Sequence, residues 1–176
     1  NVRGFIPPMF ASGFYQSRWG YTTADDFRKA ADGYRKNNIP IDMVYMDIDY
    51  MEDYKDFTVN QENFPDFEAY VNEMKEKGIH LVPIIDAGVK VEAGYDVVSA
   101  VWPGWTHFPD VLNADARAWF GQKYERLISK GIDGFWNDMN EPAMFCTPEG
   151  VAELKEYIKD NFMDNEEAPG FVLGAK

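Results

Sequence analysis

The chain has 176 residues, with 30 acidic and 17 basic side chains, and a formal net charge of −13 at pH 7. This excess of negative charge argues against nucleic acid or an anionic membrane surface as a partner, because both need a basic face. The single cysteine, Cys146, excludes an internal disulfide framework, and with only two histidines the chain lacks the ligands for a structural zinc site. No apolar run approaches the length of about 18 residues that spans a bilayer. One free cysteine and no signal-peptide pattern favour a cytoplasmic location.

The first predicted elements are a short strand and an amphipathic helix. We interpret the apolar run at residues 8–12 as the strand. Thr23, with Asp26 three residues later, has the pattern of a helix N-terminus. Apolar residues follow at i, i+3, i+4 and i+7, as expected for one buried helix face: Phe27, Ala30, Ala31 and Tyr34.

Three more units repeat this plan of a buried strand and a helix. The strands are predicted at residues 43–47, 81–86 and 134–138. The helices are predicted from Pro65 to Gly78, from Asn113 to Gly131, and from Thr147 onwards. The strand sequences are mostly apolar rather than alternating, which is typical of parallel strands covered on both faces. The order βαβαβαβα therefore predicts an α/β fold with a parallel sheet, formed by residues 1–176 as a single domain.

Three of the predicted strands end in an aspartate, at Asp47, Asp86 and Asp138. In a parallel α/β fold the functional residues gather at the carboxyl ends of the strands. An aspartate there can simply cap the next turn, and this is the alternative explanation at each position. Because the same residue type recurs at three equivalent points, we favour a cleft lined with acids.

These acids suit two kinds of chemistry. Asp47 and Asp49 could hold Mg²⁺, but the chain has no glycine-rich phosphate-binding loop to accompany such a site. Asp138 lies beside Trp136 and could act as a nucleophile at a sugar carbon, with the indole as a wall for the ring. Glu141, just before a proline, is interpreted as a residue that orders the loop rather than as a catalytic acid.

The remaining nucleophile and ligand candidates are few. His80 is predicted at the start of a strand, where it would be packed or solvated. His107 is predicted in a long loop after the third strand, where either loop packing or a ligand contact would explain it. Cys146 has no histidine near it in the sequence and is expected to be inert.

Longer motifs give the chain a resemblance to glycoside hydrolase family 31, which contains α-glucosidases and α-xylosidases. The resemblance covers residues 4–150. Its segments lie at residues 16–21, 39–42, 46–51, 56–58, 83–86, 100–104, 108–110 and 134–142, the last reading Gly-Phe-Trp-Asn-Asp-Met-Asn-Glu-Pro. The segment at 56–58 is Asp-Phe-Thr, and the resemblance assigns it no role.

The resemblance implies the N-terminal (β/α)4 half of a TIM-type (β/α)8 barrel and a retaining reaction that releases terminal α-linked glucose. It makes Asp138 the catalytic nucleophile and Asp47 a ligand of sugar hydroxyl groups. The positions that it implies to line or support the sugar pocket are Trp19, Ile48, Ile85, Asp86, Trp102, Trp136 and Met139. It implies no metal and no organic cofactor, and an α-glucoside as substrate, although an α-xyloside remains an alternative.

Two departures from the family leave a second hypothesis open. The resemblance places the acid/base aspartate in the second half of the barrel, and no such motif occurs in residues 1–176. The link from Tyr95 to Ala100 is also shorter than in the family. The alternative to an α-glucosidase is therefore a catalytically incomplete half-barrel scaffold, which forms a homodimer or pairs with a second half-barrel to cover its open sheet.

Overall fold

The computed structural model describes residues 6–90, 98–102 and 104–140. Four strands form one parallel sheet in the order β1-β2-β3-β7. The strands are β1 (Tyr15–Gln16), β2 (Met43–Met46), β3 (His80–Asp86) and β7 (Trp136–Asp138). The predicted fold class, a parallel half of a TIM-type barrel, is confirmed.

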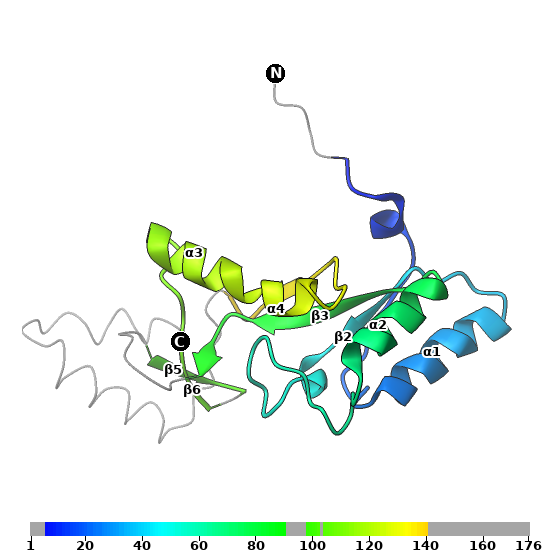
Figure 1. Ribbon diagram of the computed structural model, residues 1–176, viewed down its shortest axis with the longest axis horizontal. Coiled ribbons are helices and arrows are strands. Elements are labelled where there is room, and N and C mark those ends of the chain that lie inside the picture. Colours follow the sequence, from blue (N-terminus) through cyan, green and yellow to red (C-terminus); the bar gives the residue numbers. More distant parts are fainter. Residues whose placement is uncertain (1–5, 91–97, 103, 141–176) are drawn as a thin grey trace, which may run out of the picture.

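The helices lie between these strands and follow the predicted pattern closely (Figure 1). They are α1 (Ala24–Lys36), α2 (Phe67–Glu76), α3 (Ala114–Lys123) and α4 (Glu125–Ile128). The predicted third helix is divided at Tyr124, which ends α3 and precedes α4. The helix predicted from Thr147 lies outside the described residues.

The helix ends have specific causes. Thr23 and Asp26 form a reciprocal capping box, in which the Asp26 amide donates to the Thr23 hydroxyl and the Thr23 amide donates to the Asp26 carboxylate. Helix α2 begins two residues after Pro65, because the Asp66 carboxylate accepts the Ala69 amide at 3.0 Å and forms the N-cap. It ends before Gly78, whose φ of +69° suits glycine.

The strand predicted at residues 8–12 is wrong. The structure has a short 3₁₀ helix, η1 (Met9–Ser12), in which Ala11 donates to the Pro8 carbonyl at 3.0 Å. These local hydrogen bonds take the place of bonds to a neighbouring strand, and Met9 is 92 % exposed. Apolar composition alone suggested a buried strand, whereas the first strand is β1, three residues further on.

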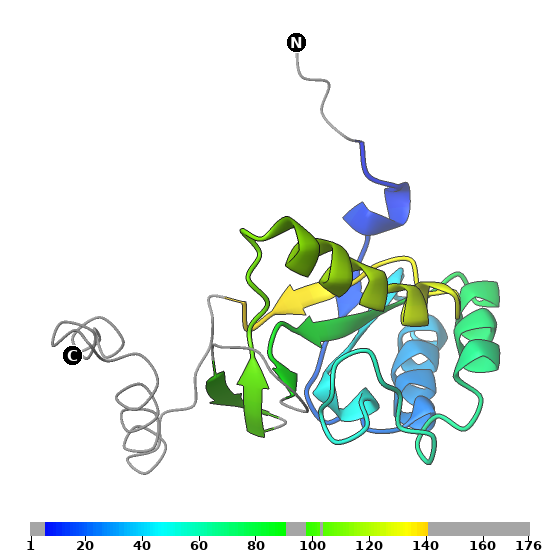
Figure 2. The same ribbon diagram turned by 60° about the vertical axis from the view of Figure 1, so that its left-hand side comes forward.

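The two faces of the sheet have different surroundings. On β2, the side chains of Val44 and Met46 lie on the face that the helices cover, and they share a hydrophobic core with Phe27 of α1 and Met74 of α2. Figure 2 shows α1 and α2 side by side against the sheet. Tyr45 points to the opposite face, because side chains alternate along a strand. We call this opposite side the inner face of the sheet.

Aromatic rings cross the inner face from β1 to β7. The Tyr15 and Tyr45 ring centroids are 5.9 Å apart, and the Tyr45 and Trp136 centroids are also 5.9 Å apart. Tyr15 is 38 % exposed, so part of this face lies open in the described chain.

A second, antiparallel sheet follows β3 and was not predicted. It consists of β4 (Val89–Lys90), β5 (Val98–Val101) and β6 (Gly104–His107), in the order β4-β6-β5. The sequence prediction treated this region as a loop, because two- and four-residue strands give little periodicity to detect. Gly88, just before β4, packs closely, since a Cβ there would lie 2.8 Å from a methyl carbon of Val101.

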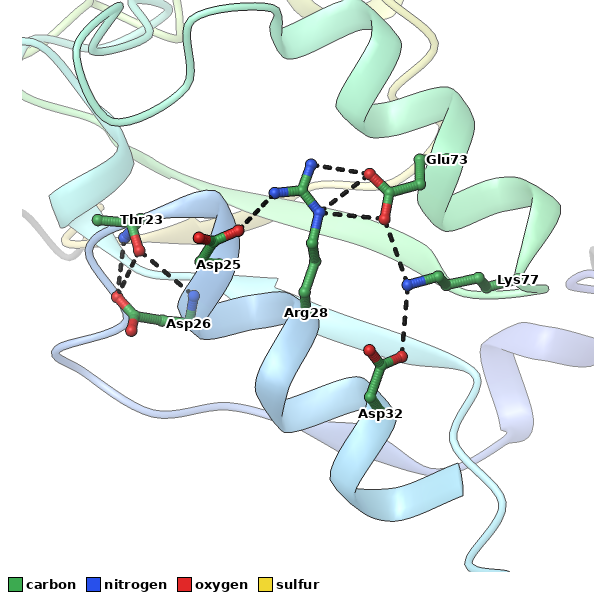
Figure 3. Close-up of polar contacts among 7 residues, drawn as sticks. All are labelled: Thr23, Asp25, Asp26, Arg28, Asp32, Glu73 and Lys77. Atoms are coloured by element: carbon green, nitrogen blue, oxygen red, sulfur yellow. Dashed lines mark hydrogen bonds and ion pairs between the residues drawn. The ribbon is translucent and has the colours of Figure 1, made fainter. Parts of the chain in front are cut away.

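An ion-pair network joins α1 to α2 on the outer surface (Figure 3). The Arg28 guanidinium donates to both Glu73 carboxylate oxygens and to Asp25, and Lys77 lies between Glu73 and Asp32. These ion pairs help to hold α1 beside α2. Within the described segments, no helix has the length and apolar content needed to cross a bilayer.

Candidate active site

The sheet register brings the strand-end aspartates to the inner face. Asp86 and Asp138 are direct partners in the β3–β7 ladder, as are Ile84 and Trp136 two residues earlier. Trp136 contacts Tyr45 on the inner face, so the alternation of side chains places Asp86 and Asp138 on that face too. Asp47, two residues after Tyr45, has the same parity. The three carboxyl groups therefore lie at one end and on one face of the sheet.

Two of these aspartates also bond locally. Asp47 is the N-cap of the 3₁₀ helix η2 (Ile48–Tyr50), and its carboxylate accepts the Ile48 amide at 2.8 Å. The Asp138 Oδ1 atom accepts the Met139 amide at 2.8 Å. The capping alternative is thus part of the explanation at both positions, and it orients each carboxylate.

Met139 adopts a φ of +57°, which is uncommon for a residue with a side chain. Such backbone conformations are often found at functional sites, where the surrounding structure maintains them. Here the strained residue follows Asp138 directly, and its amide fixes the carboxylate.

Asp86 has the most perturbed setting of the three. It is 2 % exposed, and its Oδ1 atom is buried with no hydrogen-bond partner among the described residues. Burial raises the pKa of Asp86 to about 6, with smaller contributions from the negative charges of Asp138 and Asp47. Asp86 therefore titrates in the range where proton transfer to and from a carboxyl group is useful.

A buried carboxyl group from another segment supports Asp86. The Asp86 amide donates to Asp56 Oδ1 at 2.8 Å. Burial, and then the Asp86 carboxylate, raises the pKa of Asp56 to about 8. Sequence reasoning quoted Asp56 within a motif but gave it no role. The only sequence signal for a role of Asp56 was a charged residue next to the apolar Phe57, and this signal is weak when the fold is unknown.

Aromatic residues gather beside this end of the sheet. The ring centroids of Trp19 and Trp102 are 6.1 Å apart, and those of Tyr54 and Trp102 are 6.2 Å apart. Trp19 is 64 % exposed and Trp102 is 40 % exposed. The structure thus brings together two predicted pocket residues from segments more than 80 positions apart, with Tyr54 as an addition that sequence reasoning missed.

The apolar residues of the predicted pocket lie deeper. Ile48 and Ile85 are 3 % and 1 % exposed and belong to the hydrophobic core. Ile85 has the opposite parity to Asp86, so its side chain points towards the outer layer. A contact between either isoleucine and a sugar stays a prediction.

The other acids give no metal-like arrangement. Asp49 receives a hydrogen bond from the Gly20 backbone, and its pKa is raised by burial and by Asp47. Across the parts of the chain that the structure describes, no group of three or more His, Cys, Asp or Glu residues is arranged to bind a metal ion.

The two histidines lie in regular structure. His80 begins β3 at the opposite end of the sheet, where it stacks on Phe10 and pairs with Asp133 at 3.1 Å. His107 belongs to strand β6 rather than to the predicted loop, and it is 7 % exposed. The interpretations of Glu141 and Cys146 concern positions outside the described residues.

Comparison with known proteins gives a consistent result. Residues 4–168 match the glycosyl hydrolases family 31 TIM-barrel domain. Alpha-glucosidase 2 of Bacillus thermoamyloliquefaciens is 37 % identical over 159 residues, covering 80 % of this chain and 20 % of the relative. Alpha-xylosidase 1 of Arabidopsis thaliana is 34 % identical over 186 residues, covering 94 % of this chain and 20 % of the relative.

Solved structures agree with these sequences. The crystal structure of the glucosidase II alpha subunit with Glc1Man2 bound superposes with a TM-score of 0.71 at 28 % identity, covering 80 % of this chain and 18 % of that one. The chain thus spans about a fifth of the length of the relatives it matches. With the family domain matched over nearly all of its residues, the chain belongs to glycosyl hydrolase family 31.

Proposed function

We propose that the chain forms a single half-barrel domain and supplies the nucleophile half of a retaining α-glucosidase-type active site. The observation that carries the proposal is the pairing of Asp86 with Asp138 on the inner face of the sheet, with the Met139 amide holding the Asp138 carboxylate. The kinship with α-glucosidases supports the choice of substrate.

In this mechanism an Asp138 oxygen forms a bond to the anomeric carbon while the bond from that carbon to the leaving oxygen breaks. An acid protonates the leaving oxygen, and a water molecule later releases the sugar from Asp138 with retained configuration. The family resemblance assigns the acid to the second half of the barrel. Asp47 would bind sugar hydroxyl groups, and Trp19, Trp102, Trp136 and Met139 would contact the ring or support its pocket.

The nucleophile can be tested separately from the acid. Fluoride is a good leaving group that needs no proton, so 5-fluoro-α-glucosyl fluoride should label Asp138 even where no general acid is present. The C1–F bond breaks, fluoride leaves with the electron pair, and a glycosyl ester forms on Asp138. Peptide mass spectrometry should find the sugar on the peptide that contains Asp138.

Two variants sharpen this experiment. Asp138→Asn should abolish labelling. The control Asp133→Asn makes the same change three residues before β7, at the opposite end of the sheet, and should leave labelling intact. Labelling on another residue, or labelling that survives in Asp138→Asn, would remove Asp138 as the nucleophile. Hydrolysis of an aryl α-glucoside then tests the full reaction, and competition with α-xylosyl fluoride tests the substrate class, since α-xylosidases are also relatives.

A second half-barrel is the partner that we propose for the inner face. Tyr15 lies on the edge strand β1 and is 38 % exposed, and the aromatic row from Tyr15 to Trp136 is the surface that such a partner would cover. Light scattering on the 176-residue chain checks the alternative of a second copy. A dimer that dissociates in Tyr15→Lys would assign the face to self-association, and a monomer with a cooperative melt would exclude an obligate homodimer.

The proposed cytoplasmic location rests on the one free cysteine and is tested by cell fractionation.

A further inference from the structure

We propose that Asp56 is a positioning residue for the candidate active site: its carboxyl group holds the carboxyl end of β3 and so sets the place of Asp86 beside Asp138. The contact itself is independent of any reaction, and its consequence for glycosyl transfer rests on the function proposed above.

The segment that carries Asp56 is anchored on both sides. Phe57 is 7 % exposed, and its ring packs edge-on against those of Phe120 and Tyr124, with centroids 5.4 Å and 5.1 Å away. The Thr58 hydroxyl donates to the Lys55 carbonyl at 2.6 Å and accepts the Glu52 amide at 2.9 Å. These contacts hold the backbone at Asp56 in place, so its side chain can in turn position the end of β3.

Asp56 acts on the last residue of β3. The Asp86 amide donates to Asp56 Oδ1 at 2.8 Å, beyond the point where β3 bonds to β2. The next amide, that of Ala87, donates to the Asp138 carbonyl at 3.3 Å. A continuous series of hydrogen bonds thus runs from Asp56 through the end of β3 to Asp138. A change in the first of these contacts would shift the Asp86 and Asp138 carboxyl groups relative to each other.

The buried oxygen atoms indicate that Asp56 does more than fill space. Asp56 Oδ2 and Asp86 Oδ1 are both buried and have no hydrogen-bond partner among the described residues. Burying an unpaired carboxyl oxygen is costly, and an apolar residue would avoid this cost. A carboxyl group at position 56 is explained by the amide that it accepts.

The titratable groups that face Asp56 are Asp86 of β3, Tyr50 of η2 and Tyr124 at the end of α3, and Asp86 in turn faces Asp47 and Asp138. Both tyrosines are uncharged at neutral pH because their pKa values are raised, so the charge that acts on Asp56 is that of Asp86. Burial and the Asp86 charge raise the pKa of Asp56 to about 8. Asparagine is therefore a close substitute, because it is neutral and offers an oxygen to the Asp86 amide.

The direct test is hydrogen exchange of the Asp86 amide, measured by NMR in wild type, Asp56→Asn and Asp56→Ala. We expect slow exchange in wild type and Asp56→Asn, and exchange about tenfold faster in Asp56→Ala. Asp53→Asn is the control in the same loop, since its carboxylate is 74 % exposed and asparagine suits its φ of +49°, and it should leave this amide unchanged. Equal protection of this amide in wild type and Asp56→Ala would overturn the proposal. Fast exchange at Asp86 in a folded Asp56→Asn protein would also overturn it, and this second result decides the question if Asp56→Ala does not fold.

The functional readout is the rate of Asp138 labelling by the glycosyl fluoride as a function of pH. Asp56→Asn should label at a rate close to that of wild type near neutral pH, whereas Asp56→Ala should label about 10- to 100-fold more slowly. Above about pH 8 Asp56 ionises and places a second negative charge beside Asp86, so wild type should label more slowly there and Asp56→Asn should not. Equal rates in the asparagine and alanine variants would refute the positioning role. If wild type is not labelled, the proposed function fails, and the exchange experiment still decides the role of Asp56.

Discussion

The raised pKa of Asp56 predicts an unusual dependence of the free energy of unfolding on pH. The ordinary pKa of an aspartate is 3.8, and the folded protein raises that of Asp56 to about 8. Between these values the folded chain keeps a proton that the unfolded chain has lost. Stability must therefore fall as pH rises through this window, by about 1.4 kcal/mol per pH unit for this one group.

The substitution Asp56→Asn removes this titration and keeps the hydrogen-bond acceptor. The raised pKa of Asp86, about 6, comes from burial, Asp138 and Asp47 rather than from Asp56, so we expect the substitution to leave it unchanged. Groups common to both proteins cancel in the difference between them. From about pH 6 to about pH 7.5, wild type should lose about 2 kcal/mol relative to Asp56→Asn.

Urea denaturation followed by tryptophan fluorescence at several pH values measures this difference. Asp115→Asn, on the exposed surface of α3, controls for the loss of one negative charge. If the free energies of unfolding of wild type and Asp56→Asn stay parallel from pH 6 to 7.5, Asp56 is already ionised, and the argument from burial is refuted.

Three further substitutions separate buried from exposed contacts. Tyr50→Phe removes a fully buried hydroxyl that donates to the Ile84 carbonyl at 2.7 Å, and it should cost about 1–3 kcal/mol in urea denaturation because that carbonyl loses its partner. Thr23→Ala removes the helix cap and should cost about 1 kcal/mol, with Thr23→Ser restoring most of it in a thermal melt. Glu73→Gln breaks the ion pair with Arg28, in which both side chains are about a third exposed. We therefore expect the free energy of unfolding to fall by about 0.5–1 kcal/mol, and by less in high salt. A larger loss that does not depend on salt would contradict this.

The parts of the fold that the sequence predicted well are those governed by local rules. Thr23 and Asp26 have the spacing of a capping box, and α1 begins where that box requires. The runs at 43–47 and 81–86 are short, apolar and bounded by turn signals, and the observed strands β2 and β3 match them to within one residue at each end. Composition failed at residues 8–12 because local hydrogen bonding decided their conformation.

The candidate site was predictable to the extent that it follows from strand parity. Three aspartates at equivalent strand ends were visible in the sequence. The register places Asp86 and Asp138 on the inner face, and the alternation that continues from Tyr45 places Asp47 there too. Neither the depth at which Asp86 is buried nor its contact with Asp56 could be read from the sequence. Both depend on a loop 30 residues away that is held by the Phe57 ring contacts, and tertiary packing of this kind has no periodic signal.

These observations suggest why the carboxyl end of the sheet is not built for stability. Asp47, Asp86 and Asp138 repel one another when ionised, and Asp86 and Asp56 also lose hydration on burial. Apolar side chains at these points would extend the core and stabilise the fold. The presence of four acids there, with Met139 in a strained conformation beside Asp138, is the arrangement expected where a site is maintained at the expense of stability. Substitutions that remove this repulsion at the carboxyl end of the sheet should therefore stabilise the fold.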